Sequence, residues 1–506
     1  MYLGLKLGDL VDPIAGRRWD TMEIRRQIGC RLGRFRDMAL SPGDRVFLLL
    51  GNSLEFFAEL MAVWKAGCCA VPVDSRLTTF EVENLVKAAT PRMAVVNDAV
   101  SRDTLMVMSR LGVRVVSTDH LGPFSEAGPG VSLEDAAIIL FTSGSTGDPK
   151  GVVHTHRSLR ARWISLWENL GVEPFRRTLC MLPTHFGHGL ICNCLFPWLS
   201  GQDLFIAPPF RPDLVMRLGQ LVDENRITFL SSVPAMWKLA LKLAKPPVKG
   251  TLSRVHCGSA PLSAHMWEDI RAWTGTKAVC NAYGITETGS WVAGLARADA
   301  PSEDGLIGKG WGAVVRVLRT DEVSGCMDPE ACCDPGEEGF VWINTPALMK
   351  GYFGRDDLTR KNVVDGWFRT GDKGFLDDRG WLYLRGRVRE EINKGGMKIF
   401  PSDVDAVVER FPKTVDVCTF AIEDPLYGQN VGMAVVLADL HEETFGALYA
   451  WMKAHLAESK MPVRWWVLDA IPRTSRGKVN RDAVKAACEG LKPVDLSRIL
   501  AEASTT

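Results

Sequence analysis

The chain has 506 residues, of which 46% are hydrophobic and 24% are charged. This composition is ordinary for a soluble globular enzyme and excludes disordered and fibrous proteins, and the length allows two or three domains that each bury a core. Sixty basic residues balance sixty acidic ones, so no overall field favours nucleic acid or an anionic membrane as a partner.

The first residues, MYLGLKLGDLVDP, contain neither the long apolar core nor the small-residue cleavage site of a signal peptide. No run of about 18 apolar residues is present that could span a bilayer. The thirteen cysteines include no C-x-x-C pair of zinc spacing. We therefore expect a cytoplasmic protein with reduced thiols and no membrane span. The cluster Cys326, Cys332 and Cys333 is compatible with a redox-active group, but an irregular surface loop is the simpler interpretation.

Apolar runs alternate with helical patterns over about the first 380 residues, which is typical of layered α/β proteins. Residues Arg45–Leu50 are predicted to form a buried strand, and Leu54–Ala66 the helix that follows it. Further strands are predicted at Met93–Val96, Ala137–Phe141, Thr228–Leu230 and Arg254–His256. No period of about 20 to 50 residues repeats, which excludes solenoids and propellers.

The loop FTSGSTGDPKG, Phe141–Gly151, follows one of these strands and precedes a helical stretch at Ser158–Leu170. Its glycines allow backbone N–H groups to turn toward an anion, its hydroxyl groups add donors, and Lys150 adds a positive charge. It is not a P-loop, because no Lys-Ser or Lys-Thr pair follows Gly147. Taken alone, it indicates either a phosphate site or a flexible surface turn.

The pattern changes near Asp377. The stretch WLYLRGRVREEINKGGMKIFP alternates as a hairpin does, with a turn at Gly395-Gly396. Beyond it we predict helices at Ser402–Arg410 and Glu442–Ala457 and strands at Val415–Ile422 and Val431–Leu437. The sequence thus indicates a large α/β domain of residues 1–386 and a small α+β domain of residues 387–506, with the boundary at Gly386–Arg389.

Five motifs occur in a characteristic order between about Arg45 and Arg481. They are TSGSTGDPKG with the following GVVHTH, NAYGITETG, GWFRTGDKGFLDDRGWLYLRGR, NKGGMKIFPSDVD and PRTSRGKVNR. Together they resemble the adenylate-forming superfamily of acyl-CoA synthetases, nonribosomal adenylation domains and luciferases, and most closely an acid–CoA ligase. The resemblance implies a large N-terminal domain of layered sheets and helices and a small mobile C-terminal domain.

The same resemblance implies the reaction and its cofactors. A carboxylic acid is activated with ATP and Mg²⁺ to an acyl-adenylate, and the acyl group then passes to a thiol, that of CoA or of a carrier protein's phosphopantetheine. Two anions meet in the first step, so cations and oriented donors are needed. Lys478 matches the catalytic lysine that bridges the acyl carboxylate and the α-phosphate, where a buried ammonium would stabilise the transition state.

Other motif positions imply the binding residues. Thr286 matches the donor to the α-phosphate, Glu287 matches the magnesium ligand, and Thr146 is a second candidate for that metal. Tyr283 matches the aromatic that stacks on adenine, and Asp372 the carboxylate that accepts the ribose hydroxyls. The nucleotide-binding residues implied are Thr142, Ser143, Gly144, Ser145, Thr146, Gly147, Lys150, Gly258, Ser259, Ala260, Pro261, Asn281, Ala282, Tyr283, Gly284, Asp372 and Arg387.

The small domain of this family rotates between the two half-reactions. Gly395 and Gly396 match the face that meets the incoming thiol, where glycine allows close backbone approach. Arg389 occupies the hinge position, at which the family more often has Asp or Lys. A charged residue there is compatible with a solvent-exposed pivot.

The segment LPTHFGHGL occupies the place of the family's acyl pocket. Phe186 stands where an aromatic gate is expected, and His185 and His188 flank it as either substrate contacts or structural hydrogen-bonding groups. Gly284 stands where acetyl-CoA synthetases carry a bulky Trp, which favours an open pocket for an aryl or longer acid over acetate.

Three functions remain open at this point. The first is an acid–CoA ligase acting on a small-molecule carboxylic acid, as a monomer or homodimer. The second is a freestanding adenylation enzyme that loads an acyl carrier protein in trans, because too few residues follow Lys478 for a fused carrier. The third is a non-catalytic nucleotide-binding regulator, which the presence of Glu287, Asp372 and Lys478 disfavours.

Overall fold

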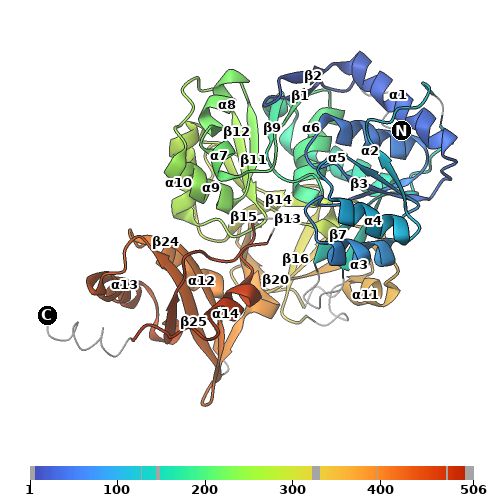
Figure 1. Ribbon diagram of the computed structural model, residues 1–506. Helices are drawn as coiled ribbons and strands as arrows, with labels where there is room; N and C mark the ends of the chain where they lie inside the picture. Colours follow the sequence, from blue (N-terminus) through green and yellow to red (C-terminus); the bar gives the residue numbers. More distant parts are fainter. Residues whose placement is uncertain are drawn as a thin grey trace.

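The computed structural model describes residues 6–126, 128–143, 149–321, 331–395, 397–474 and 477–495. Three sheets organise these residues: a seven-stranded and a fourteen-stranded sheet in a large lobe, and a five-stranded sheet in a small lobe. In Figure 1 the small lobe, drawn in brown and red, lies below the large lobe and adjoins it near β15 and β20. This arrangement confirms the predicted α/β fold class with a smaller α+β C-terminal part.

The seven-stranded sheet is parallel at its centre and antiparallel at one end. In spatial order its strands are β18 (Gly351–Tyr352), β8 (Pro149–Thr155), β7 (Ala136–Ser143), β4 (Cys69–Pro72), β3 (Arg45–Leu49), β5 (Met93–Val96) and β6 (Arg114–Ser117). The associated helices are α1 (Thr21–Asp37), α2 (Leu54–Lys65), α3 (Thr79–Ala89), α4 (Arg102–Arg110) and α5 (His156–Leu170). Ser53 caps α2 by accepting a hydrogen bond from the Phe56 backbone N–H, which places its start where the sequence predicted it.

The large sheet is parallel from β1 through β13, apart from its edge strand β2, and becomes antiparallel from β14 onward. In spatial order its strands are β16 (Val314–Leu318), β17 (Gly339–Asn344), β20 (Trp367–Leu376), β21 (Leu382–Arg387), β15 (Leu306–Gly310), β14 (Ser290–Gly294), β13 (Val279–Ile285), β12 (Arg254–Gly258), β11 (Phe229–Ser232), β9 (Arg177–Cys180), β10 (Asp203–Ile206), β1 (Leu10–Asp12) and β2 (Arg17–Trp19), with β19 (Val363–Val364) beside β20.

Helices cover both faces of its parallel part. One face is covered by α7 (Pro212–Val215), α8 (Leu218–Glu224), α9 (Pro234–Leu243) and α10 (Ala264–Thr274). The other face is covered by a π-helix (His188–Leu195) and by α6 (Phe196–Leu199). A further helix, α11 (Asp356–Asn362), follows later in the chain. Figure 1 shows α7 to α10 on the outer side of β11 and β12. The inner face shares one apolar core with α1, α2 and α5, so the two large sheets form a single packed body.

The small lobe is a mixed sheet with its own core. Its strands are β23 (Met397–Ile399), β22 (Ile392–Lys394), β25 (Gly428–Leu437), β24 (Thr414–Asp424) and β26 (Arg464–Val467), and its helices are α12 (Pro401–Glu409), α13 (Glu442–His455) and α14 (Arg481–Cys488). The hairpin predicted around Gly395 is present, because β22 and β23 pair with Lys394 opposite Met397. The domain boundary at Gly386–Arg389 stays a prediction.

One strand was not predicted. Between the Gly-rich loop and the predicted helix, which is present as α5 (His156–Leu170), β8 intervenes and pairs antiparallel with β7. Its residues Val152 to Thr155 are all buried, so the strand lacks the polar alternation by which a half-exposed strand is recognised. The loop therefore joins two strands rather than a strand and a helix.

Among the described residues every cysteine is a free thiol, and most are buried. Burial raises the pKa of Cys68, Cys69, Cys257 and Cys280 to about 12. Cys332 and Cys333 are half-buried near β16, and burial raises the pKa of Cys333 to about 11. Cys326 lies outside the described residues, so the predicted cluster is seen only in part.

Candidate active site

The predicted site residues of the large lobe gather where β11, β12 and β13 end and the sheet turns antiparallel. Ligands of open α/β sheets bind at this edge, because loops leave the carboxyl ends of the parallel strands there. Gly258 ends β12 and Tyr283 lies near the end of β13. A Cβ at Gly258 would lie 2.4 Å from the carbonyl oxygen of Ala282, so only glycine permits this approach of the two strands.

A buried carboxylate stands at the centre of this region. Asp372 on β20 is 6% exposed and accepts a hydrogen bond from the hydroxyl of Tyr283. Its Oδ1 lies 2.7 Å from Nε of Arg387, because β20 and β21 pair these two residues directly. Burial raises the pKa of Asp372, and the charge of Arg387 opposes the shift. The three residues that the sequence assigned to the nucleotide thus contact one another, and their roles stay predictions.

Thr286 and Glu287 form a short turn directly after β13. Tyr352 on β18 donates a hydrogen bond of 2.8 Å to Oε1 of Glu287, so the two large sheets meet at this carboxylate. The described residues contain no cluster of three or more His, Cys, Asp or Glu side chains that would hold a metal by themselves. One carboxylate still fits Mg²⁺, which keeps several waters and binds phosphate oxygens.

Two buried side chains that the sequence did not single out hold this turn from behind. His154 on β8 donates from Nε2 to the carbonyl of Thr286 at 2.7 Å, and Arg162 on α5 donates to the carbonyl of Thr288 at 2.9 Å. Burial lowers the pKa of His154 to about 4 and that of Arg162 to about 10. His154 was visible in the sequence only as part of GVVHTH, and no pattern predicted its partner.

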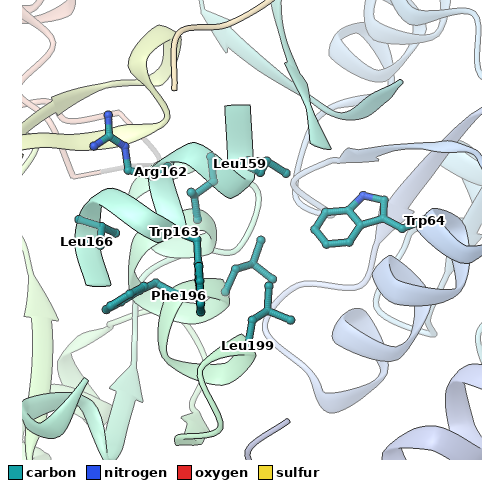
Figure 2. Close-up of a pocket in the computed structure, with 9 residues that line it drawn as sticks. Trp64, Leu159, Arg162, Trp163, Leu166, Phe196 and Leu199 are labelled. Atoms are coloured by element: carbon teal, nitrogen blue, oxygen red, sulfur yellow. The ribbon is translucent and has the colours of Figure 1, made fainter. Parts of the chain in front are cut away.

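Arg162 also borders a small cavity that is separate from the site. Figure 2 shows this cavity among Trp64, Leu159, Leu166, Phe196 and Leu199, with the guanidinium of Arg162 directed away from Trp64. Its volume is about 20 Å³, which is room for about one water molecule. Because its lining is almost wholly apolar, we regard it as a packing gap in the core and not as the substrate site.

The small lobe brings Lys478 to the same region. The turn that carries it contacts the large lobe at Gly477, where a Cβ would lie 3.2 Å from Phe210 and 3.4 Å from Ala235. The charge of Lys478 contributes to the low pKa of His188, which burial mainly causes, and opposes the rise that burial produces at Asp372. Lys478 therefore lies near both groups. The sequence analysis expected a buried ammonium, but Lys478 is exposed, because its turn lies at the junction between the lobes.

The three acyl-pocket candidates, His188, Phe186 and His185, lie in different surroundings. His188 is buried, with Nδ1 2.8 Å from Oγ of Ser259 and Nε2 2.7 Å from Oγ of Ser231, and burial lowers its pKa to about 3. Phe186 packs in the core under α7 to α10. His185 lies 3.6 Å from Asp74, away from these serines. Of the two histidines, His188 alone joins the cluster at the strand ends.

The structure gives Gly284 a role other than opening the acyl pocket: it allows close approach of two backbone segments. A Cβ there would lie 2.0 Å from the carbonyl oxygen of Ser290, at a bulge between β13 and β14. The bulky side chain of this region comes instead from Trp291, which pairs opposite Gly284 and is 1% exposed. Asn281 donates to the carbonyl of Leu306, which gives it a structural role between strands.

The structure gives the positions of several other predicted site residues, whose roles stay predictions. Ser259 adopts a left-handed φ of 66° directly before Ala260 and Pro261, and Thr142 pairs with Lys150 at the mouth of the Gly-rich loop. Gly395 contacts Tyr427, and Arg389 is exposed after β21. Residues Gly144, Ser145, Thr146, Gly147 and Gly396, and the side chain of Ser143, lie outside the described residues.

Comparisons with known proteins agree with this arrangement. Residues 30–353 match the model of the family described as AMP-binding enzyme, and residues 403–478 match the model described as AMP-binding enzyme C-terminal domain. A feruloyl-CoA synthase of an Amycolatopsis species is 28% identical over 470 residues, which cover 92% of each chain.

Two solved structures share the fold. An o-succinylbenzoate CoA synthetase of Bacillus subtilis, in complex with its acyl-adenylate intermediate, superposes with a TM-score of 0.84 at 23% identity, covering 97% of this chain and 96% of that one. An amide bond synthetase of Marinactinospora thermotolerans gives a TM-score of 0.81 at 22% identity, covering 96% and 98%. In the described part of the chain, no helix is long and apolar enough to cross a bilayer.

Proposed function

The chain belongs to the AMP-binding enzyme family, as its motifs predicted, and from this premise we propose that it is an AMP-forming ligase that joins a carboxylic acid to a thiol. In the first step a carboxylate oxygen of the acid attacks the α-phosphorus of ATP and pyrophosphate leaves. In the second step the thiol sulfur attacks the acyl carbonyl, the proton of the thiol is lost, and AMP leaves.

One observation carries this proposal: the turn of Lys478 packs against the large lobe at Phe210 and Ala235, where the charge of the lysine acts on His188 and Asp372. A mobile ammonium beside a carboxylate-lined nucleotide site is what the first step requires, because it offsets the repulsion between the acid and the α-phosphate. Residues more than 300 positions from the Gly-rich loop thus complete a site that neither lobe contains alone.

The roles of the other residues follow from the same geometry. Asp372, held by Tyr283 and Arg387, presents carboxylate oxygens suited to ribose hydroxyls. We assign Thr286 as the donor to the α-phosphate and Glu287 as the ligand of Mg²⁺, which when bound would neutralise phosphate charge. His154 and Arg162 are positioning residues, because they hold the Thr286–Thr288 backbone and not the substrate.

We propose CoA as the acceptor. Support comes from the relative named feruloyl-CoA synthase, which this chain matches along 92% of its length. The second step would need a different face of the small lobe, that of Gly395 and Gly396, to approach the adenylate. Arg389, exposed between the two lobes after β21, is the proposed hinge, and Gly386–Arg389 the proposed domain boundary.

The proposal is tested by pyrophosphate exchange and AMP release with a panel of carboxylic acids, with and without CoA. We expect at least one acid to support ATP–pyrophosphate exchange without CoA and to release AMP only when CoA is added. Replacement of Lys478 by Ala should lower the exchange rate by about 1,000-fold. Lys485, an exposed lysine on α14, supplies the matched control, since Lys485→Ala should leave exchange unchanged.

Two outcomes would contradict the proposal. Retained exchange in Lys478→Ala would remove the catalytic role of that lysine. If the adenylate accumulates although CoA is present, and only a carrier protein discharges it, then the acceptor is phosphopantetheine and not CoA.

A further inference from the structure

A single stretch of backbone joins the two lobes. Strand β21 of the large sheet ends at Arg387, and β22 of the small sheet begins at Ile392, so the residues between them, Val388–Glu391, link the lobes. We call these residues the lobe connection. They begin with a short 3-10 turn, Val388–Glu390, whose middle residue, Arg389, is exposed. A rotation of the small lobe changes the backbone dihedral angles of this segment, because hinges are short stretches of this kind.

The lobe connection carries two neighbouring carboxylates, and each is paired with a different lobe. Glu391 lies 2.9 Å from Nζ of Lys373 on β20 of the large lobe. Glu390 lies 3.3 Å from Nη1 of Arg481, at the start of α14 in the small lobe. Charged contacts therefore hold the lobe connection from both sides, although it is the segment that the proposed rotation must bend.

The pair of Lys373 and Glu391 is shielded from water. The two side chains are 12% and 9% exposed. Lys373 also lies over the ring of Phe340 on β17, with Nζ 4.9 Å from the ring centroid. Exposed ion pairs contribute little, whereas the loss of one member of a shielded pair leaves the other charge poorly solvated. We therefore expect this pair to stabilise the docked lobes more than the exposed pair of Arg410 and Asp304 does.

Lys373 directly follows Asp372, the proposed partner of the ribose hydroxyls. Neighbouring residues on a strand point to opposite faces, and burial alternates along β20 in agreement with this rule, with Asp372 buried and Lys373 half-buried. On the neighbouring strand β21, Asp372 stands opposite Arg387 and Lys373 stands opposite Gly386. One residue of β20 thus serves the proposed nucleotide site, and the next contacts the lobe connection.

Arg481 joins the other carboxylate to the segment that carries the proposed catalytic lysine. It stands three residues after Lys478 and pairs with Asp405 on α12 at 2.6 Å as well as with Glu390. It also donates to the carbonyl of Thr419 on β24 at 3.1 Å. Because these contacts fix Arg481 within the small lobe, the position of the lobe connection also determines where the turn of Lys478 lies.

On the basis of the proposed function, we propose that Lys373 is a positioning residue for adenylate formation. By holding Glu391, it keeps the lobe connection in the arrangement that brings Lys478 to the strand ends. In the second step the small lobe turns about Arg389, and Glu391 leaves Lys373. The pair then stabilises only the first arrangement, and a contact shifts an equilibrium by the difference that it makes between the two states. Loss of the pair slows the first step and spares the second.

A purely structural role of the pair has different consequences. If Lys373 only stabilised β20, its replacement would also disturb the neighbouring Asp372 and weaken the binding of ATP. Both half-reactions would then fall together, because both use the nucleotide site. The rate of the second half-reaction and the affinity for ATP therefore distinguish positioning from general stabilisation.

The first experiment measures the two half-reactions separately. Lys373→Met keeps the apolar part of the side chain beside Phe340 and removes the charge, and Glu391→Gln keeps the shape of the side chain. We expect each variant to form adenylate about tenfold more slowly in single-turnover pyrophosphate release, with the affinity for ATP changed less than about twofold. Thioester formation from acyl-adenylate supplied to the enzyme should keep its rate or rise.

A double-mutant cycle assigns the effect to the contact. The variant with both Lys373→Met and Glu391→Gln should form adenylate within about twofold of the slower single variant, because the second change removes a contact already lost. Lys373→Arg keeps the charge and should stay within about threefold of the unaltered protein. Lys361 on α11 and Glu423 on β24 are exposed, so Lys361→Met and Glu423→Gln are the matched controls and should change nothing.

Cleavage by trypsin reports on the lobe connection without any substrate. Arg389 is exposed within it, and a protease cuts such a site when the segment opens locally. The cut after Arg389, identified by the masses of the fragments, should be about fivefold faster in Lys373→Met and in Glu391→Gln than in the unaltered protein. The two control variants should be cut at the unaltered rate.

The outcomes separate this inference from the proposed function. Equal loss in both half-reactions, losses that multiply in the double variant, or an unchanged rate of cleavage after Arg389 would each show that Lys373 does not position the small lobe, and the ligase activity would stand. If no carboxylic acid supports pyrophosphate exchange in the unaltered protein, the proposed function fails and the role of Lys373 in adenylate formation fails with it.

Discussion

The two lobes hold their parts of the site in different ways. The large lobe presents Asp372 and Tyr283 as buried, mutually hydrogen-bonded side chains on β20 and β13, and His188 as a buried side chain at the start of the π-helix, next to Ser231 and Ser259. The small lobe presents Lys478 on an exposed turn. We call the large-lobe residues the rigid half, because the proposed nucleotide-binding groups are hydrogen-bonded within one lobe, whereas the position of the lysine depends on how the lobes dock.

The docking itself relies on ion pairs. Lys238 on α9 lies 2.7 Å from Glu409 and 2.7 Å from Asp416 of the small lobe, and Asp416 is also held by Arg473 of its own lobe at 2.6 Å. A second pair joins Arg410 to Asp304 at the surface. Water can replace an exposed pair such as Arg410–Asp304 at modest cost, which is compatible with the proposed rotation of the small lobe.

The sharpest test of the rigid half is Asp372→Asn. The change removes the buried negative charge that faces Arg387 and that accepts the hydrogen bond of Tyr283. We expect pyrophosphate exchange to fall by about 100-fold or more and calorimetric binding of ATP to weaken in parallel. The exposed Asp378→Asn is the control. Normal ATP binding in Asp372→Asn would show that the cluster is structural.

Acid sensitivity should also reside in the rigid half. The pKa of His154 falls from 6.5 to about 4 on burial, so the stability it contributes is complete above pH 6.5 and is lost as the pH falls toward 4. Between pH 7 and pH 5 the loss is about 2 kcal/mol. In His154→Gln the difference between the free energies of unfolding in urea at these two pH values should shrink by that amount. An unchanged difference would mean that His154 is solvated.

The docking contacts should have a smaller and more selective effect. We expect Lys238→Met to slow adenylate formation about tenfold, because the lobe that carries Lys478 docks less often. Thioester formation from acyl-adenylate supplied to the enzyme should change less than twofold. Lys242→Met, an exposed site one turn along α9, is the matched control. Equal loss in both half-reactions would contradict a selective docking role.

The smallest effect is expected at the surface pair. Arg410 and Asp304 are each about two-fifths exposed, and exposed pairs contribute little. Arg410→Ala should change adenylate formation by less than twofold in rapid-quench measurements. A loss as large as that in Lys238→Met would show that exposed and buried contacts share the docking equally.

Much of the fold could be predicted because local pattern and final structure agree. The strand Met93–Val96 has the predicted bounds, and the helix α2 begins at the predicted Leu54 because Ser53 caps it. The small lobe's hairpin and helices also appear where periodicity and glycines placed them. β8 was missed because both its faces are buried, which removes the signal of alternation.

The site was predictable only where a motif recorded it. Tyr283, Asp372 and Arg387 lie in recognisable motifs and form one cluster. His154 lies in the motif GVVHTH, but the carbonyl of Thr286 that it holds is 132 residues away, and Lys238 lies in no motif and pairs with acidic residues of the small lobe. At Gly284 the sequence predicted an open pocket, but the missing side chain allows the backbone of Ser290 to approach. The large side chain in this region is that of Trp291 on the neighbouring strand.

The cysteines give the chemistry a further property. Attack on a disulfide requires a thiolate, and thiols with a pKa near 12 are almost wholly protonated at neutral pH. An enzyme that accepts a free thiol as its second substrate therefore carries many sulfur atoms that do not exchange with that thiol or with its oxidised dimer. Cys68, Cys69, Cys257 and Cys280 should therefore stay unmodified when the folded protein is treated with alkylating reagents at neutral pH.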